Sequence, residues 1–322
     1  MNGAAEWEPT ASPAALRLRA LLLTRARGFF AERGVLEVET PLLGASTATD
    51  PHIESLRTSV GGSPRFLQTS PELFMKRLLA AGSGPIYQIA RVFRAGESGP
   101  RHNPEFTLLE WYRPGFDHHA LMNEVEEFLQ VVLGLAEGER ESYAEVFRRW
   151  VGADPHHAGA SELESRAKTL GLHPVSSSGF SREDWLHLLM AEAIEPRLGI
   201  ERPHFVYDFP LELKALARIR RGGKGEPDVA ERFEVFVRGL ELANGYHELT
   251  DASEQRQRFL ADLESRRAMG RAETPLDERM LAALERGLPP CAGVALGFDR
   301  LVMIAASAPS LRSVLSFSFD RA

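Results

Sequence analysis

Apolar residues near the N-terminus recur at the spacing of an α-helix. Leu18, Leu22 and Phe29 lie among arginines, and Gly34 follows them. Residues with this period fall on one side of a helix and pack against a core, and glycine is common just beyond a helix end. We therefore expect an amphipathic helix over residues 13–33.

Alternating helices and strands fill the rest of the chain. Ser70 can cap a helix that begins at Pro71 and ends at Gly82. We expect strands over 35–41, 85–94, 204–210 and 232–250, helices over 121–135 and 251–270, a mostly helical insertion over about 136–200, and a glycine-rich strand entering a helix over 293–306. Strands from distant segments favour an α+β fold, an antiparallel sheet flanked by helices.

Composition narrows the classes of function. The chain has 322 residues, of which 43% are hydrophobic, and this is enough for a large folded core. The net charge of −7 argues against nonspecific binding to nucleic acid, and the one cysteine, Cys291, excludes an internal disulfide. The sequence shows no secretory signal and no apolar run of about 18 residues. We therefore expect a cytoplasmic protein that does not span a membrane.

The stretch FRAGESGPRHNPEFTLLEWY, residues 93–112, is the first candidate site. On a strand, Phe106, Glu110 and Tyr112 fall on one face. A buried carboxylate is costly unless it meets a cation, so Glu110 is expected to bind a substrate cation or, alternatively, a neighbouring arginine.

Cationic side chains stand on both sides of the predicted loop. Arg94 lies at its entrance, and Arg101 and His102 lie near its exit. Guanidinium groups bind phosphate or carboxylate oxygens through two nitrogens at once. Together with the aromatic ring of Phe106, they indicate a site for a nucleoside triphosphate, while GxGxxG and GxxxxGK[ST] patterns are missing.

A second candidate site lies in FEVFVRGLELANGYHEL, residues 233–249. Glu234 and Glu241 are seven positions apart and can face one site only if the chain turns between them, for which Gly239 is the natural place. Two carboxylates near Asn244 suit Mg²⁺, although solvated strand residues would show the same spacing.

Two strand faces complete the candidate set. Asn244, Tyr246 and Glu248 alternate along one strand and can line one wall of a pocket. In GVALGFDR, residues 293–300, Gly293, Ala295 and Gly297 leave one face nearly bare, and Arg300 follows at the start of a helix. A flat ligand can lie against such a face; the alternative is close packing of a helix.

These segments, in this order, resemble the three signature motifs of class II aminoacyl-tRNA synthetases. The matching regions are motif 1 at about 26–44, motif 2 at about 86–112 and motif 3 at about 291–306. TSPEL, RHNPEFT and ELANGYHELTD resemble the lysyl branch. Position 96 departs from motif 2, because it is Gly96 where glutamate is usual, and the glutamate here is Glu97.

The resemblance implies a role for each candidate residue. It assigns Arg94 and Arg300 to catalysis, and Arg94, Arg101, His102, Phe106, Gly297 and Arg300 to ATP. It assigns Glu234 and Glu241 to Mg²⁺, and Glu72, Glu110, Tyr112, Asn244, Tyr246, Glu248 and Ala295 to the amino-acid substrate. Ala295 stands where lysyl-tRNA synthetases typically have glycine.

Motif 1 begins roughly 25 residues from the first residue, so we expect residues 1–322 to form one catalytic domain without an N-terminal anticodon-binding OB domain. This arrangement resembles the elongation factor P lysine ligases, which attach (R)-β-lysine, or lysine less well, to a lysine of elongation factor P. The resemblance implies a homodimer and no tRNA substrate. Two alternatives remain, a truncated synthetase that charges tRNA and a non-catalytic regulatory paralogue.

Overall fold

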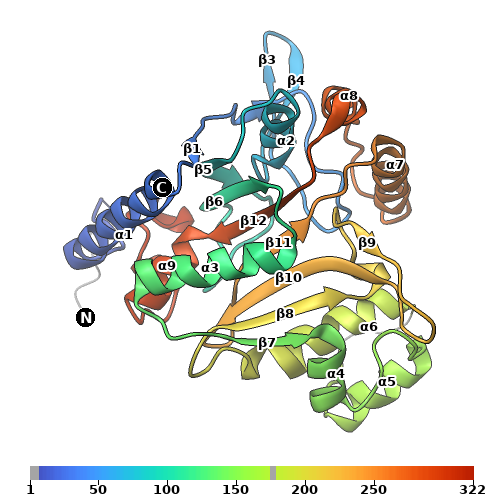
Figure 1. Ribbon diagram of the computed structural model, residues 1–322. Helices are drawn as coiled ribbons and strands as arrows, with labels where there is room; N and C mark the ends of the chain where they lie inside the picture. Colours follow the sequence, from blue (N-terminus) through green and yellow to red (C-terminus); the bar gives the residue numbers. More distant parts are fainter. Residues whose placement is uncertain (1–6, 175–178) are drawn as a thin grey trace. The chain divides into compact units, whose positions relative to one another are not determined.

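The computed structural model describes residues 7–174 and 179–322 (Figure 1). The chain divides into two compact units. The first contains the N-terminal part up to Gly115, with Thr250–Cys291 and Ala295–Ala322, and the second contains Phe116–Leu249 and Ala292–Val294.

The first unit has a sheet in the order β1-β5-β6-β12. Its strands are β1 (Leu36–Glu37), β5 (Ile86–Phe93), β6 (Glu105–Pro114) and β12 (Cys291–Gly297). β1 runs parallel to β5, whereas β5 and β6 form an antiparallel hairpin without a break in register from Ile86↔Tyr112 to Phe93↔Glu105. A separate three-stranded sheet has the order β2-β4-β3, with β2 (Leu43–Gly44), β3 (Arg57–Val60) and β4 (Ser63–Leu67).

Helices and short turns complete the first unit. They are α1 (Pro13–Glu32), α2 (Glu72–Ala80), α7 (Ala252–Ala268), α8 (Glu278–Gly287), α9 (Phe298–Ala305), η4 (Leu311–Ser313) and η5 (Phe319–Arg321). α9 packs on β6, and α1 packs on α9. The ring of Phe30 in α1 stacks on Tyr87 of β5 with ring centroids 4.3 Å apart, which fixes the first helix against the sheet.

The second unit has strands in the order β12-β11-β10-β8-β7. Besides β12, these are β7 (Glu139–Ser142), β8 (His204–Phe209), β10 (Val229–Val237) and β11 (Leu240–His247), and the short β9 (Ile219–Arg220) pairs with β10 outside this order. β10 is antiparallel to β8, β9 and β11, and β7 runs parallel to β8. The helical elements are α3 (His118–Leu133), α4 (Tyr143–Val151), α5 (Ala160–Thr169), α6 (Arg182–Leu189), η1 (Met190–Ile194), η2 (Glu195–Arg197) and η3 (Leu211–Leu213).

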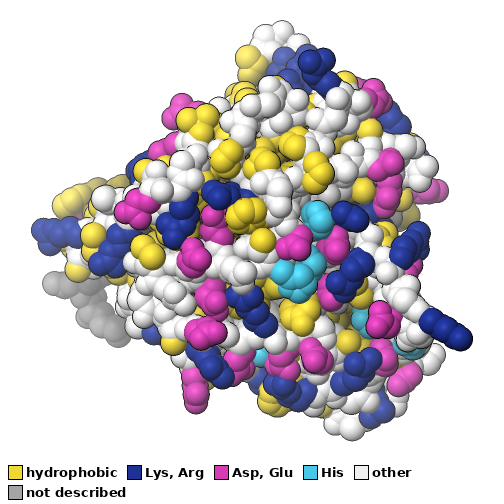
Figure 2. Space-filling view, in the orientation of Figure 1, with side chains coloured by type: hydrophobic (Ala, Val, Ile, Leu, Met, Phe, Trp, Pro, Cys, Tyr) yellow, Lys and Arg dark blue, Asp and Glu magenta, His cyan; other side chains and the backbone are white. Residues whose placement is uncertain are grey.

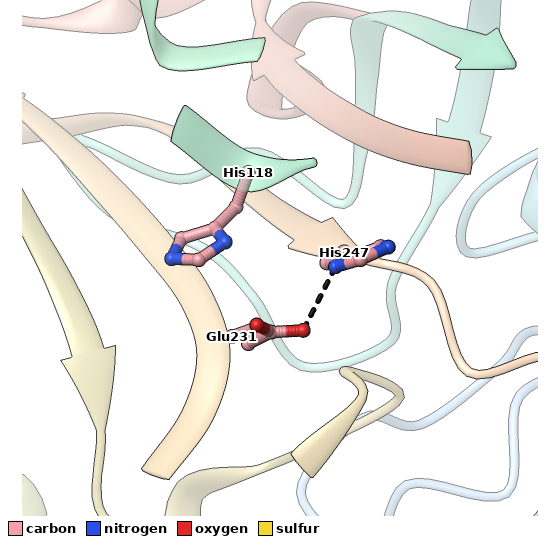
Figure 3. Close-up of side chains that lie close together, drawn as sticks. All are labelled: His118, Glu231 and His247. Carbon is pink, nitrogen blue, oxygen red and sulfur yellow. Dashed lines mark ion pairs between the residues drawn. The ribbon is translucent and has the colours of Figure 1, made fainter. Parts of the chain in front are cut away.

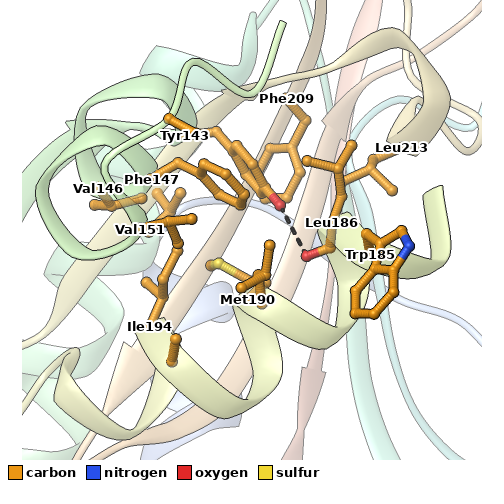
Figure 4. Close-up of a cluster of buried hydrophobic side chains, with 14 of the residues drawn as sticks. Tyr143, Val146, Phe147, Val151, Trp185, Leu186, Met190, Ile194, Phe209 and Leu213 are labelled. Atoms are coloured by element: carbon orange, nitrogen blue, oxygen red, sulfur yellow. Dashed lines mark hydrogen bonds between the residues drawn. The ribbon is translucent and has the colours of Figure 1, made fainter. Parts of the chain in front are cut away.

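The predicted insertion shares a packed core with β8 and β10 (Figure 4). Tyr143 and Phe147 of α4, Trp185 of α6 and Phe209 of β8 are buried together. The Tyr143 hydroxyl donates to the Leu186 carbonyl at 3.4 Å, so this buried hydroxyl is satisfied. The helices between residues 143 and 197 therefore cover β8 and β10 with apolar side chains.

The α+β fold with a mainly antiparallel sheet flanked by helices is confirmed. The strand predicted over 35–41 is shorter, because only Leu36–Glu37 pair with β5. The polar strand Glu139–Ser142 lacks apolar alternation and was missed, as was α8. The helix that begins at Glu72 has the Ser70 hydroxyl as acceptor for its first N–H, at 3.0 Å. Among the described helices, none is long and apolar enough to cross a membrane.

Candidate functional site

The motif 2 hairpin of the first unit turns through Gly96. This residue has a φ of +81°, a conformation that L side chains rarely adopt, so the glycine is required by the path of the loop. Glu97 follows, and its carboxylate lies 3.6 Å from the Arg94 guanidinium. The glutamate displaced by one position thus pairs with the arginine assigned to ATP.

Arg94 and Phe106 face each other across the hairpin. The guanidinium carbon lies 5.0 Å from the centroid of the Phe106 ring, a cation–π contact. Phe106 and Ala295 pack beside the buried cluster of Ala90, Val92 and Leu108. The Arg94 Nε is buried and, within residues 7–174 and 179–322, has no hydrogen-bond partner, so it retains a donor for a ligand oxygen.

Arg300 and His102 form a second pair in the first unit. The Arg300 guanidinium lies 3.0 Å from the His102 Nε2, although these residues are 198 positions apart. Arg101 beside them is exposed. A Cβ at Gly297 would lie 3.5 Å from the Arg300 side chain, an ordinary contact, so Gly297 lies directly beside Arg300 at the start of α9.

Asp299 holds this part of the first unit together and was missed from the sequence. Its carboxylate accepts from the Arg19 guanidinium at 2.5 Å and from the Thr107 backbone N–H at 2.8 Å. The side chain is almost fully buried, so these charge-assisted bonds are shielded from water. Asp299 directly precedes Arg300, so these bonds hold the start of α9 against Arg19 of α1 and against Thr107, the residue after Phe106. The sequence signal that could have identified Asp299 is its position between the candidate residues Gly297 and Arg300.

Glu110 is buried with both carboxylate oxygens hydrogen-bonded. The Tyr112 hydroxyl donates to Oε1 and the Ser70 hydroxyl donates to Oε2, each at 2.7 Å. The two hydroxyl donors therefore fix the orientation of the carboxylate. Glu72, assigned to the same substrate, pairs at 2.7 Å with the buried ammonium of Lys76.

In the second unit, Arg232 connects three of the assigned residues. Its guanidinium forms an ion pair with Glu234 and donates to the Asn244 side-chain oxygen at 3.2 Å. The Asn244 amide in turn donates to the Tyr246 hydroxyl at 3.1 Å. Arg232 was missed, although its even separation from Glu234 on one strand predicts a shared face.

The turn expected between Glu234 and Glu241 is present. Arg238 and Gly239 both have positive φ, at 55° and 68°, and join β10 to β11 in a two-residue hairpin. Burial raises the pKa of Glu234 to about 7, the Arg232 charge opposes this rise, and the Glu241 charge adds to it. The two carboxylates are therefore close enough to repel each other. A cation bound between them would relieve this repulsion.

Glu248, assigned to the substrate, is buried at the end of this segment. Its backbone forms a bridge with Ala217, and Leu249 donates to the Leu216 carbonyl at 3.3 Å. The basic loop over 218–228 is partly ordered by β9 and by an ion pair between Arg221 and Asp228. Some of the predicted residues therefore lie in the first unit and the others in the second. The roles assigned to them stay predictions.

Comparisons with known proteins show the family to which the chain belongs. Residues 6–321 match the family model described as tRNA synthetases class II (D, K and N). The chain is 51% identical over 328 residues to the elongation factor P--(R)-beta-lysine ligase of Edwardsiella ictaluri, covering 100% of both chains. It is 50% identical to the protein of the same name from Vibrio cholerae, covering 98% of this chain and 99% of that one. The Proteus mirabilis protein of that name is 49% identical, with 100% of both covered.

Proposed function

Because the chain belongs to the class II tRNA synthetase family (D, K and N), we propose that it is an ATP-dependent ligase that joins (R)-β-lysine to a lysine side chain of elongation factor P. The observation that carries this proposal is the identity of about half, over full length, to relatives named for that reaction. Lysine would be a poorer substrate.

The reaction has two steps. In the first, a carboxylate oxygen of (R)-β-lysine attacks the α-phosphorus of ATP, the bond to the β-phosphate oxygen breaks, and pyrophosphate leaves. A carboxylate is already ionised, so the step needs positioning and charge stabilisation rather than a base. In the second, the ε-amine of the acceptor lysine attacks the adenylate carbonyl carbon. An amide forms, AMP leaves and the amine releases a proton.

We assign the nucleotide to the first unit. Arg94 would contact the α-phosphate, with its buried Nε as one donor, and Phe106 would stack on adenine. His102 and Arg101 would contact the outer phosphates, and Arg300 would hold the adenine from the other side. The paired side chains of Arg300 and His102 support this assignment, because a second cation is placed near the hairpin.

We assign the diamino-acid substrate to acidic and polar groups, as the resemblance to the lysyl branch implies. Glu72, Glu110 and Glu248 would accept from its two ammonium groups. Tyr112, Asn244, Tyr246 and Ala295 would complete the contacts. The hydrogen bonds that orient the Glu110 side chain support this role, because a carboxylate fixed in one orientation loses little entropy when it binds a cation.

The fit of Mg²⁺ rests on Glu234 and Glu241. Two mutually repelling carboxylates on one hairpin are a suitable donor set for this ion, which prefers oxygen ligands. When bound, Mg²⁺ would supply positive charge to the phosphates. Arg232 holds Glu234 in place without the ion, so it serves as the positioning group for that carboxylate.

We further propose one catalytic domain, a homodimer and a cytoplasmic location. Motif 1 residues Leu36, Leu42 and Leu43 are exposed, and α1 exposes Leu21, which supports a subunit interface there. Light scattering at several protein concentrations tests the dimer, and Leu36→Glu should lower the molar mass by half. A molar mass unaffected by this change would contradict the interface.

Pyrophosphate exchange followed by transfer tests the reaction. We expect exchange with (R)-β-lysine to be faster than with lysine, and transfer to elongation factor P but not to tRNA. Exchange with transfer only to tRNA would favour a truncated synthetase, and the absence of any exchange would favour a regulatory paralogue.

A further inference from the structure

Three side chains from separate segments meet in the second unit (Figure 3). His118 comes from the first turn of α3, Glu231 from β10 and His247 from the end of β11. Each offers one ligand atom, and these atoms all lie within 4.8 Å of one another. On the face shown in Figure 2, histidine side chains (cyan) lie directly beside acidic ones (magenta).

His118 is oriented as metal-binding histidines are. Its side chain is 1% exposed, and its Nε2 lies 3.3 Å from a carboxylate oxygen of Asp208. Its Nδ1 is buried and has no hydrogen-bond partner in the part of the chain that the structure describes. A carboxylate on one ring nitrogen fixes the tautomer and directs the other nitrogen to a ligand.

Glu231 and His247 present two further buried ligand atoms. The Glu231 Oε2 lies 2.8 Å from the His247 Nδ1, so the groups attract each other. These two atoms are buried and pair with each other, whereas the His118 Nδ1 beside them has no hydrogen-bond partner among the described residues. Leaving that buried nitrogen unsatisfied is costly, and one cation held by all three side chains would satisfy it.

We propose that His118, Glu231 and His247 bind a divalent cation of the zinc class. Two imidazole nitrogens and one carboxylate oxygen suit Zn²⁺, with water in the fourth position. At bond lengths of about 2.0–2.1 Å, tetrahedral ligand atoms lie about 3.4 Å apart, so small side-chain movements bring the present separations, 2.8 Å between Glu231 and His247 and at most 4.8 Å overall, to that value.

Arg218 is the competing cation at this cluster. Its Nε lies 3.6 Å from the Glu231 Oε2, but the arginine side chain is 58% exposed. An exposed pair at that distance is weak and screened by salt, so a metal ion can replace it.

A second cluster in the same unit gives a control. Glu139, Glu141 and His204 also lie within 4.8 Å of one another. There both imidazole nitrogens face carboxylates, at 3.3 and 3.1 Å, and arginines already pair with the glutamates. We therefore assign no metal to this second cluster.

The proposed ion has a structural role. Side chains alternate along β11, so His247 faces away from Tyr246 and Glu248, the residues assigned to the amino-acid substrate. The ion would fasten the first turn of α3 to β10 and β11, which also pack against this helix. Its effect would be on the stability of the second unit.

Titration of the metal-free full-length protein with Co²⁺ and then Zn²⁺ tests the proposal. We expect one equivalent of Co²⁺ with the visible absorption of tetrahedral coordination, displaced by Zn²⁺. His118→Gln should weaken binding by about 100-fold or more, and Asp208→Asn by about 10–100-fold. His204→Gln should bind as the unmodified protein does.

Thermal melting gives the second readout. Zn²⁺ should raise the melting temperature of the unmodified protein and of His204→Gln, but not that of His118→Gln. If His118→Gln does not fold, Glu231→Gln takes its place with the same expectation. Absence of saturable binding to the unmodified protein, or equal affinity in a folded His118→Gln or Glu231→Gln variant, would overturn the proposal.

Discussion

Arg232 pairs with Glu234 two positions away on the same strand, and both side chains are largely removed from water. The arginine also donates to Asn244 on the neighbouring strand. A carboxylate assigned to a metal is therefore held by a fixed cation before any ion binds. This arrangement keeps the charged group oriented, and it makes the protonation of Glu234 a measurable property.

The pH dependence of stability should reveal Glu234. Its pKa is raised to about 7 from an ordinary value of 4.5, mainly by burial. A carboxyl group that is harder to ionise in the folded state stabilises the fold at low pH, and this contribution is lost as pH rises through the folded-state pKa. The free energy of unfolding without Mg²⁺ should therefore decrease between about pH 5 and pH 8.

Urea unfolding at both pH values measures this change. Glu234→Gln cannot ionise, so its unfolding free energy should fall less over the same interval. Equal pH dependence in the two proteins would show that Glu234 does not titrate in this range.

Glu241→Gln should stop adenylate formation without unfolding the protein. The substitution keeps the shape and removes one of the two charges assigned to Mg²⁺, so we expect a loss of about 100-fold or more in pyrophosphate exchange. The melting temperature should change little, since Glu241 is only partly buried. Glu139→Gln, a carboxylate of the same unit outside the assigned site, is the control. Near-normal exchange in Glu241→Gln would refute the metal assignment.

Ala295→Gly should shift the choice of amino acid toward lysine. Removing one methyl group from the face of β12 enlarges the space beside Phe106, and one such group changes discrimination by about 10–200-fold at most. The measurement is the ratio of kcat/KM for (R)-β-lysine and lysine in pyrophosphate exchange. Ala292→Gly, an odd number of positions away on the same strand, should leave the ratio unchanged; an equal shift in both variants would argue against a pocket contact.

Tyr112→Phe should destabilise the first unit through Glu110. The buried carboxylate would lose one of two hydroxyl donors, which costs about 1–3 kcal/mol of unfolding free energy. The test is a double-mutant cycle with Glu110→Gln. In that variant the tyrosine hydroxyl should contribute less to the free energy of unfolding, because its charged partner has been removed. Additive effects of the two substitutions would contradict a direct coupling.

Local patterns predicted much of the fold and part of the site. The apolar period gave α1 and the alternating faces of β6, and the odd separation of Glu234 and Glu241 predicted the turn found at Gly239. Arg232 was missed because strand spacing places it on the face of Glu234 but does not show that the two side chains pair. His118 could not be found, since its neighbours Glu231 and His247 are more than 100 positions away and only the folded chain brings them together.

The hairpin that carries Glu234 and Glu241 also has a consequence for the order of folding. Its strands are joined by two residues, so these carboxylates can be brought together by a local event of about 1–10 μs. The bond between Asp299 and Thr107, by contrast, closes a loop of 192 residues. During refolding, we therefore expect the amides of β10 and β11 to become protected from hydrogen exchange before the Thr107 amide. Glu234 and Glu241 would then come together early, and the segments around Phe106 and Arg300 would reach their final arrangement late.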